Sequence, residues 1–312
     1  MSWPAAPVTV VVPATSANLG PGFDSLGLAL SLHDTVRASV RPAGLTVDVT
    51  GAGASQAGRP ERHLVIRAMR AAFAAIGEQP PGIAISCRNE VPQGFGLGSS
   101  AAAIVAGVLA ARALTAAGRP GAGPADVLAE YDVLRLASDI EGHPDNVAAC
   151  LLGGLTIAWQ AEAELQVARL TPLPELTPVL CVPALPLATK AARLVLPEQV
   201  PHAAAAANSA RAALLIAALT GRPDLLLAGT EDFLHQPYRA AAIPATTDLI
   251  ARLRTGGIPA VVSGAGPAVL ALTVTSLTGT ADDVARIAGA TGTAWRVLPL
   301  QVDARGARVQ AG

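Results

Sequence analysis

Three alternate glycines, followed by two serines and an alanine-rich segment, constrain this chain more than any other stretch. They lie in Pro92–Ala103, which reads Pro-Gln-Gly-Phe-Gly-Leu-Gly-Ser-Ser-Ala-Ala-Ala; we call Pro92–Gly98 the glycine loop. Glycine permits positive φ angles and lets a ligand come close to the backbone. Ser99 or Ser100 can cap a helix, and the N-terminus of a helix suits a phosphate. The pattern favours phosphate binding over the alternative, a strand-to-helix turn in which the glycines are incidental.

The spacing of the glycine loop excludes two common phosphate-binding motifs. A Walker loop needs Gly-Lys-Ser/Thr, and this stretch contains no lysine. The dinucleotide-binding pattern needs its third glycine where Ser99 stands. The surrounding residues predict a strand at Ile83–Arg88 before the loop and a helix at Ser100–Ala117 after it. That helix is apolar nearly all round, so we expect it to be buried.

Length and composition indicate a globular protein with a substantial core. The 312 residues suit one large or two medium domains, and we place a boundary at residues 155/156, giving domains of residues 1–155 and 156–312. The formal net charge is −1 with no basic cluster, which argues against nucleic acid as a partner. Only 14% of the residues are charged, so part of the surface is expected to be covered in an oligomer.

The cysteines and the apolar segments predict a cytoplasmic location and no membrane span. The three cysteines are scattered and show neither a disulfide framework nor zinc-ligand spacing. The first residues lack the positive region of a signal peptide. The most apolar run is Ser99–Leu114, but Arg112 and the preceding glycine loop favour a buried core helix.

Local patterns predict several further elements. Val8–Val12 is expected to be a strand that ends at Pro13, and Ala125–Ile140 a single helix. Residues Arg305–Gly312 are expected to form a frayed tail.

Three separated motifs together resemble those of the GHMP small-molecule kinases, and in particular the homoserine kinases within them. The first is the glycine loop with the two serines. The second is Pro13–Asp24, read Pro-Ala-Thr-Ser-Ala-Asn-Leu-Gly-Pro-Gly-Phe-Asp, which we call the N-terminal motif. The third is Ser263–Pro267, read Ser-Gly-Ala-Gly-Pro, which we call the C-terminal motif. The resemblance implies that ATP is bound by Pro92, Gly94, Gly96, Leu97, Gly98, Ser99, Ser100 and Ala101.

The segment Glu141–Asn146, read Glu-Gly-His-Pro-Asp-Asn, also resembles the family. In the family, a glutamate here holds Mg²⁺ between the nucleotide phosphates, which implies Glu141 and Ser99 as metal ligands. One carboxylate, a hydroxyl and phosphate oxygens are hard ligands of the kind that Mg²⁺ prefers. The alternatives are that Glu141 is a solvated helix end and that Asp145-Asn146 is an ordinary helix cap.

The resemblance also implies the residues that bind and activate an amino acid substrate. Thr189 and Arg193 resemble a Thr-x-x-x-Arg segment, and Arg239 ends a His-x-x-x-Arg segment; both arginines would hold the substrate carboxylate. The alternative for a lone arginine is an exposed surface position. The implied substrate-binding residues are Asn18, Asp24, Asn146, Thr189, Arg193 and Arg239, and the implied catalytic residues are Asp24, Asn146 and Arg193. One departure is His63, where family members often carry an asparagine near the nucleotide base.

The resemblance implies an α+β protein with the two-domain GHMP kinase fold. Its N-terminal half would be like ribosomal protein S5 domain 2, and its C-terminal half ferredoxin-like. The implied activity is ATP- and Mg²⁺-dependent phosphorylation of L-homoserine to O-phospho-L-homoserine in threonine biosynthesis, commonly by a homodimer. The alternatives are a GHMP kinase for another alcohol such as mevalonate, a diphosphomevalonate decarboxylase, and a non-catalytic GHMP-like binding protein.

Overall fold

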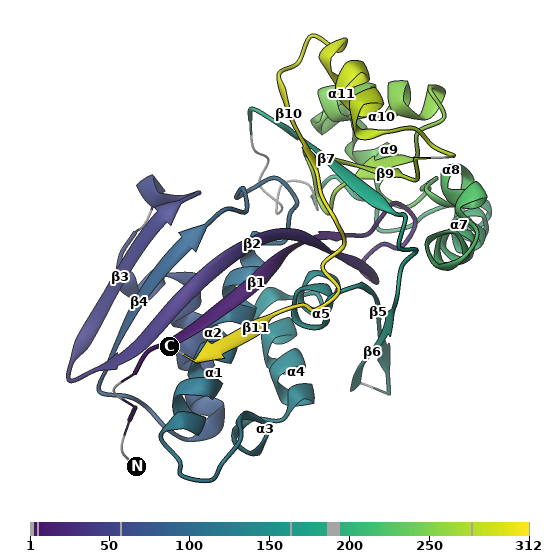
Figure 1. The fold of residues 1–312 in the computed structure, drawn as a ribbon. Coiled ribbons are helices and arrows are strands. Elements are labelled where there is room, and N and C mark those ends of the chain that lie inside the picture. The colour runs from purple at the N-terminus through teal and green to yellow at the C-terminus, as the bar shows by residue number, and fades with distance from the viewer. Residues whose placement is uncertain are drawn as a thin grey trace.

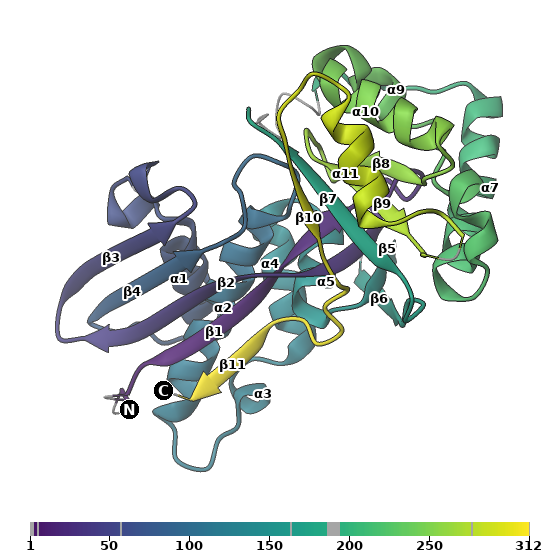
Figure 2. The same cartoon turned by 45° about the horizontal axis from the view of Figure 1, so that its top comes forward.

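Two β-sheets and the helices packed on them make up the described chain (Figures 1 and 2). The computed structural model describes all residues except 1–2, 5, 57, 163, 186–193, 276 and 312. The larger sheet has seven strands in the order β11-β1-β2-β4-β3, with β5 paired to β2 and β6 paired to β5. The smaller sheet has four strands in the order β10-β7-β9-β8. This mixture of helices and mainly antiparallel strands confirms the predicted α+β class.

The larger sheet combines strands from both ends of the chain. Its strands are β1 (Val8–Ala17), β2 (Leu26–Arg41), β3 (Gly44–Gly51), β4 (Gly82–Asn89), β5 (Leu155–Ala161), β6 (Glu164–Leu170) and β11 (Arg308–Ala311). The first residues of β1 and the second half of β2 alternate between buried and more exposed positions, so one face of this part of the sheet is covered and the other meets solvent. The second half of β1 and the first five residues of β2 are buried throughout. The covered face carries α1 (Leu64–Ile76), α2 (Ser99–Ala117), α4 (Glu130–Glu141) and α5 (Asp145–Leu152).

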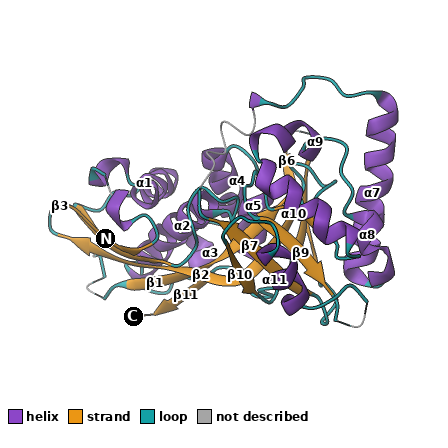
Figure 3. Cartoon of the chain, turned by 90° about the horizontal axis from the view of Figure 1, so that it is seen from above, coloured by secondary structure: helices purple, strands orange, loops and turns teal. Residues whose placement is uncertain are grey.

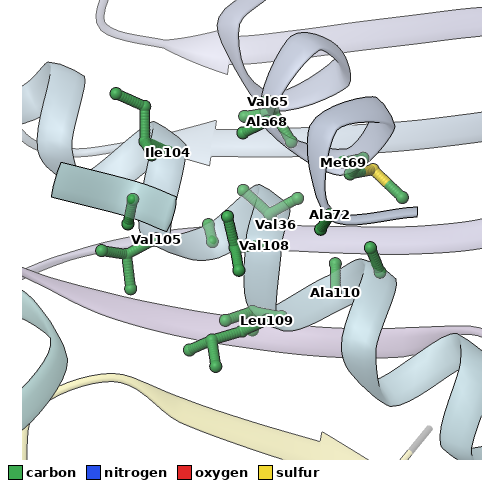
Figure 4. Close-up of a cluster of buried hydrophobic side chains, with 14 of the residues drawn as sticks. Val36, Val65, Ala68, Met69, Ala72, Ile104, Val105, Val108, Leu109 and Ala110 are labelled. Carbon is green, nitrogen blue, oxygen red and sulfur yellow. The ribbon is translucent and has the colours of Figure 1, made fainter. Parts of the chain in front are cut away.

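Helix α2 is the centre of this half, as the sequence predicts. Most of its residues are buried, and its small side chains allow close packing against α1 (Figure 4). A Cβ at Gly107 would stand 2.6 Å from the carbonyl oxygen of Val65, so the two helices approach closely only because this position has no side chain. Around this contact, Ile104 and Val108 of α2 join Met69 of α1 in one hydrophobic core.

The smaller sheet is covered by helices of the C-terminal half (Figure 3). Its strands are β7 (Thr177–Pro183), β8 (Ala260–Val262), β9 (Val269–Thr273) and β10 (Trp295–Pro299). Helices α10 (Pro244–Thr255) and α11 (Ala281–Gly289) share one hydrophobic core with this sheet. Helix α7 (His202–Thr220) and the short α8 (Leu226–Gly229) contribute to a separate core, which also contains residues of the N-terminal motif. Two further short α-helices within the described residues are α3 (Pro124–Val127) and α9 (Gln236–Arg239).

Three local predictions are wrong. Strand β1 continues through Pro13 to Ala17, because its register with β2 shifts between Pro13 and Ala14 and the proline sits where the ladder is interrupted. The expected helix Ala125–Ile140 is two helices, α3 and α4, because the buried Leu128 between them is extended. The expected frayed tail contains β11, which pairs antiparallel with β1.

Asp303 fixes the return of the chain to the larger sheet. Its carboxylate accepts hydrogen bonds from the backbone N–H groups of Arg305 (2.7 Å) and Gly306 (2.8 Å), and it lies 2.6 Å from His33 Nε2 on β2. The end of the chain is thereby held against the first half. The domain boundary at residues 155/156 stays a prediction; the sheets themselves change later, between β6 and β7.

Among the residues that the structure describes, two helices are long and apolar enough to cross a membrane by length and composition. Helix α2 is mostly buried in the protein core, whereas few residues of α7 are buried. Burial of this kind is typical of the core helix of a folded domain, so α2 is explained without a membrane.

Candidate active site

A cleft of about 660 Å³ brings the predicted motifs together. Its middle is formed by the glycine loop and the first residues of α2, and its two ends differ in chemistry. One end carries groups from the N-terminal motif, the C-terminal motif and α9, and the other end lies beside the start of α1. Predicted site residues that line the cleft are Asn18, Asp24, Gly94, Gly96, Leu97, Gly98, Ser99, Ser100, Glu141, Asn146 and Arg239.

The glycine loop needs glycine at Gly96 and Gly98 for two reasons. Both residues have positive φ angles, 76° and 65°, which other residues rarely adopt. A Cβ at Gly96 would overlap the carbonyl oxygen of Ser263, and one at Gly98 would overlap Thr15 Oγ1. The loop is therefore packed directly against the N-terminal and C-terminal motifs. The predicted ATP-binding residue Ala101 lies in α2, where it is fully buried and does not line the cleft.

Helix α2 begins with uncapped backbone donors. Its N-cap is Gly98, which makes no side-chain hydrogen bond to the first turn. The prediction that Ser99 or Ser100 caps the helix is therefore wrong. The free N–H groups and the helix dipole instead leave this end suited to an anion such as a phosphate.

A carboxylate from another helix stands beside the start of α2. Ser100 Oγ donates a 2.5 Å hydrogen bond to Glu141 Oε1 at the C-terminal end of α4. Hydroxyl and carboxylate oxygens next to a helix end suited to a phosphate fit a Mg²⁺ ion that takes its other ligands from phosphates and water. The hydroxyl that contacts Glu141 is that of Ser100; the predicted ligand Ser99 also lines the cleft.

Asn146 lies beneath the glycine loop. Its Oδ1 accepts a 2.8 Å hydrogen bond from Thr15 Oγ1, and both residues are buried. Asp145 accepts a 2.7 Å hydrogen bond from the Asn146 backbone N–H and lies 2.8 Å from His143 Nδ1. These contacts fix the start of α5 against β1 and against Gly98.

The N-terminal motif forms a strained turn at one end of the cleft. Asn18, Leu19 and Asp24 have positive φ angles of 68°, 50° and 53°, uncommon values for residues other than glycine. The side chain of Asn18 holds this turn, because Nδ2 donates to the Gly264 carbonyl (2.9 Å) and Oδ1 accepts from the Asp24 N–H (2.9 Å). Backbone strain of this kind clusters at functional sites when the surrounding structure fixes it.

The C-terminal motif joins the other two motifs. Ser263 Oγ donates to the carbonyl oxygen of Gly96 (2.7 Å) and lies 2.9 Å from Ser16 Oγ. The N–H of Gly264 donates to the carbonyl of Ala17 at 3.1 Å. The C-terminal motif therefore fixes the glycine loop and the N-terminal motif relative to each other.

Arg239 supplies a buried positive charge at this end of the cleft. Only 2% of its surface is exposed, and the guanidinium lies 5.8 Å from the centre of the Phe23 ring. Its Nη1 donates to the Gly264 carbonyl at 3.2 Å and lies 2.9 Å from His235 Nδ1. The predicted partner Arg193, with Thr189, lies outside the described residues.

Sequence reasoning did not select Asp34, which supports the glycine loop from β2. Its Oδ1 accepts hydrogen bonds from the N–H groups of Glu90 (2.7 Å) and Val91 (2.9 Å), at the end of the strand that leads into the loop. Burial raises the pKa of Asp34, although the two N–H groups favour its charged form. The sequence pattern could have revealed it, because Asp34 lies on the same face of β2 as the apolar residues Val36 and Ala38. A charged residue is unexpected on this buried face.

The opposite end of the cleft is lined by His63, Arg59 and Arg62 at the start of α1. Burial lowers the pKa of His63, and its Nδ1 has no hydrogen-bond partner among the described residues. His63, where GHMP kinases often carry an asparagine, therefore faces the cleft.

Comparisons with known proteins agree with this geometry. Residues 63–154 match the GHMP kinases N terminal domain, and residues 210–293 match GHMP kinases C terminal. The homoserine kinase of Streptomyces coelicolor is 52% identical over 305 residues, which cover 98% of this chain and 95% of the relative. The homoserine kinase of Leifsonia xyli subsp. xyli is 48% identical over 304 residues, covering 97% and 91%.

Solved structures show the same fold. The crystal structure of homoserine kinase from Cytophaga hutchinsonii superposes with a TM-score of 0.82 at 27% identity, covering 99% of both chains. A mevalonate kinase from L. major, at 17% identity and a TM-score of 0.71, covers 94% of this chain and 95% of its own, and shares the fold alone. The predicted two-domain GHMP kinase fold is confirmed, and the chain belongs to the GHMP kinase family, among the homoserine kinases.

Proposed function

We propose that this protein is a homoserine kinase, which transfers the γ-phosphoryl group of ATP to the hydroxyl of L-homoserine and forms O-phospho-L-homoserine for threonine biosynthesis. The observation that carries this proposal is the cleft itself, in which a buried arginine and the N-terminal motif stand beside a phosphate-binding loop. Two homoserine kinases are 52% and 53% identical to this chain over 98% of its length, which supports the same substrate.

Each end of the cleft is assigned one substrate. The uncapped start of α2 would hold the ATP phosphates, with the nucleoside toward His63. Arg239 would bind the homoserine carboxylate, because a guanidinium pairs with a carboxylate through two parallel hydrogen bonds. Arg193 and Thr189 are proposed to complete this carboxylate site. Asn18 and Asp24 would face the substrate amino group.

Catalysis would depend mainly on positioning and electrostatics, as phosphoryl transfer generally does. The homoserine hydroxyl oxygen attacks the γ-phosphorus directly, and the bond from that phosphorus to the bridging oxygen of ADP breaks. The hydroxyl proton is released to solvent. Asp24 orients the amino group or the hydroxyl. Asn146, fixed by Thr15, contacts the substrate from beneath the glycine loop.

Glu141 with Ser99 or Ser100 would hold Mg²⁺. The chemistry that the ion supplies is neutralisation of charge on the phosphate oxygens. The hydrogen bond between Ser100 and Glu141 supports this assignment, because a hydroxyl oxygen and a carboxylate oxygen, both of the kind that Mg²⁺ prefers, lie side by side at the start of α2.

A cytoplasmic homodimer without nucleic acid or membrane partners completes the proposal. The low content of charged residues and the alanine-rich α7, of which few residues are buried, support coverage of part of the surface by a second copy. Light scattering coupled to gel filtration should give twice the chain mass of 31.3 kDa; a monomer at micromolar concentration would contradict the dimer.

An ADP-release assay over a panel of small alcohols tests the reaction. Homoserine should be turned over in an ATP- and Mg²⁺-dependent manner, with mevalonate and the neutral analogue homoserinol as poor substrates. Turnover of mevalonate without turnover of homoserine would keep the kinase fold and reject the substrate. No turnover of any alcohol, with ATP bound, would favour a binding protein.

A further inference from the structure

A buried histidine links the N-terminal motif to the arginine at the substrate end of the cleft. His235 is fully buried. Its Nδ1 lies 2.9 Å from Arg239 Nη1, and its Nε2 lies 2.9 Å from the carbonyl oxygen of Gly20. One imidazole ring therefore contacts the guanidinium with one nitrogen and the strained turn with the other.

The partners determine which nitrogen carries the proton. A guanidinium has only N–H donors and stays charged in proteins, so Nδ1 of His235 must accept the hydrogen bond from Arg239. The Gly20 carbonyl can only accept, so Nε2 carries the hydrogen and donates it. The arrangement requires the neutral imidazole, because a doubly protonated ring would point an N–H at the guanidinium.

The surroundings keep this ring neutral. Burial lowers the pKa of His235, the charge of Arg239 lowers it further, and the Asp232 carboxylate, 3.4 Å from Nε2, opposes them in part. At neutral pH the ring is therefore the acceptor that Arg239 needs.

Asp232 fixes the backbone that carries the histidine. Its Oδ1 accepts from the Leu234 N–H at 2.8 Å, and its Oδ2 accepts from the N–H groups of His235 (3.1 Å) and Gln236 (2.6 Å). The ring of Phe23 packs on His235 with centroids 5.3 Å apart. The imidazole is thus held by a charged side chain, an aromatic ring and a backbone carbonyl, as a rigid support requires.

We propose that His235 is a positioning residue, whose neutral imidazole holds the Arg239 guanidinium in the orientation that receives the substrate carboxylate. The proposal rests on the proposed function, because it assigns the arginine to the carboxylate of homoserine. In this proposal His235 acts on the substrate only by positioning Arg239. Selectivity for a substrate with a carboxylate should therefore depend on Nδ1 of His235, which accepts the hydrogen bond from Arg239. A purely structural role would depend on the Nε2 bond to Gly20.

Two substitutions separate the two nitrogens. In H235N the amide oxygen stands at the same bond separation from the backbone as Nδ1, so an acceptor for Arg239 is kept and the donor to Gly20 is lost. In H235Q the amide nitrogen stands at the separation of Nε2, so the donor to Gly20 is kept and the acceptor is lost. The same two substitutions at His202, exposed at the start of α7, are the matched controls.

The readout is the ratio of kcat/KM for homoserine to kcat/KM for homoserinol, which lacks the carboxylate. Partial loss of folded protein lowers both values equally and leaves the ratio unchanged. H235Q should lower the ratio by about 10- to 100-fold, the effect of losing one hydrogen bond to a charged group. H235N should stay within about 3-fold of wild type, and the KM for ATP should not change in either variant. If H235Q does not fold, H235L, which lacks both polar atoms, should show the same loss of the ratio.

Two results would overturn the inference while leaving the proposed function intact. One is that the wild-type protein phosphorylates homoserine but H235Q, or its substitute H235L, has the same homoserine-to-homoserinol ratio of kcat/KM as wild type. The other is a larger loss of the ratio in H235N than in H235Q, which would assign the role to the Gly20 contact. Wild-type protein that does not phosphorylate homoserine would instead reject the proposed function, and the inference with it.

Discussion

Replacing Gly98 by alanine should disrupt the glycine loop through one atom. Gly98 has a φ angle of 65°, and an added Cβ would overlap Thr15 Oγ1 and stand 2.9 Å from Asn146 Oδ1. The substitution therefore combines backbone strain with displacement of the Thr15–Asn146 hydrogen bond. Gly121 is the matched control, since its φ angle is 81° and an added Cβ would meet nothing within 4 Å.

The two variants should differ by a calculable amount. An L-residue in the left-handed region costs about 1 to 2 kcal/mol, and both variants carry this cost. In G98A overpacking adds about 1 to 3 kcal/mol, and the displaced hydrogen bond adds about 1 kcal/mol. The free energy of unfolding should thus fall by about 2 to 4 kcal/mol more in G98A than in G121A.

Urea denaturation of both variants measures this difference, and calorimetry with ATP measures the effect on the site. ATP should bind G98A at least about 10-fold more weakly than wild type, because the overlap moves the donors at the start of α2. Binding to G121A should be unchanged. Adding T15A to G98A removes the overlapping oxygen and should restore part of the lost stability. Equal destabilisation of G98A and G121A would refute the overlap as the cause. So would a G98A/T15A variant whose loss of stability equals the sum of the losses in the two single variants.

The remaining predictions concern charge. E141Q keeps the shape of the side chain but removes its charge, so the Mg²⁺ concentration for half-maximal rate should rise and kcat should fall; a wild-type Mg²⁺ titration would contradict the metal assignment. R239A should lower kcat/KM for homoserine by roughly 30- to several-thousand-fold, the range for truncating a desolvated charge pair, and R239K should restore it only in part. Equal losses for homoserine and homoserinol would show that Arg239 only supports the fold. Burial alone would raise the pKa of Asp303, but hydrogen bonds from His33 and from backbone N–H groups outweigh it and hold that pKa below its usual value. A carboxyl whose pKa is lower in the folded chain than in the unfolded chain stabilises the fold above the unfolded-state pKa, so this stabilisation should be lost as the pH falls below about 4. In denaturant titrations D303N should have a smaller free energy of unfolding than wild type at pH 7 and should lose less of it on acidification. Parallel curves of unfolding free energy against pH for D303N and wild type would contradict the assignment.

The sequence identified most of the cleft because its motifs are local. The glycine spacing, the two serines and the apolar stretch after them predicted both the loop and the buried α2, and the structure contains both. Asn18, Glu141, Asn146 and Arg239 were selected through resemblance to family motifs, and all of them line one cleft. Their roles in binding and catalysis stay predictions, as do those of Thr189 and Arg193.

The missed residues make contacts that join segments far apart in the chain. Thr15 contacts Asn146 across 131 positions, and His235 contacts Gly20 across 215. Neither contact has a local pattern, because a hydrogen bond between distant residues leaves no periodicity in either segment. Thr15 and His235 do stand in quoted motifs, the N-terminal motif and the His-x-x-x-Arg segment, but neither was selected as a site residue. Asp34 carried a different signal, as a charged residue on the inward-facing side of a strand.

The sequence by itself determined what is encoded in neighbouring residues: glycines where the backbone needs positive φ, helices and strands by the spacing of apolar residues, and motifs that show the family. Tertiary structure decided which of these segments meet. It continued β1 through Pro13 by shifting the register with β2, and it turned an expected frayed tail into β11. The physical reason is that an apolar pattern specifies that a face is to be buried, whereas the choice of what covers that face depends on packing among all the segments at once.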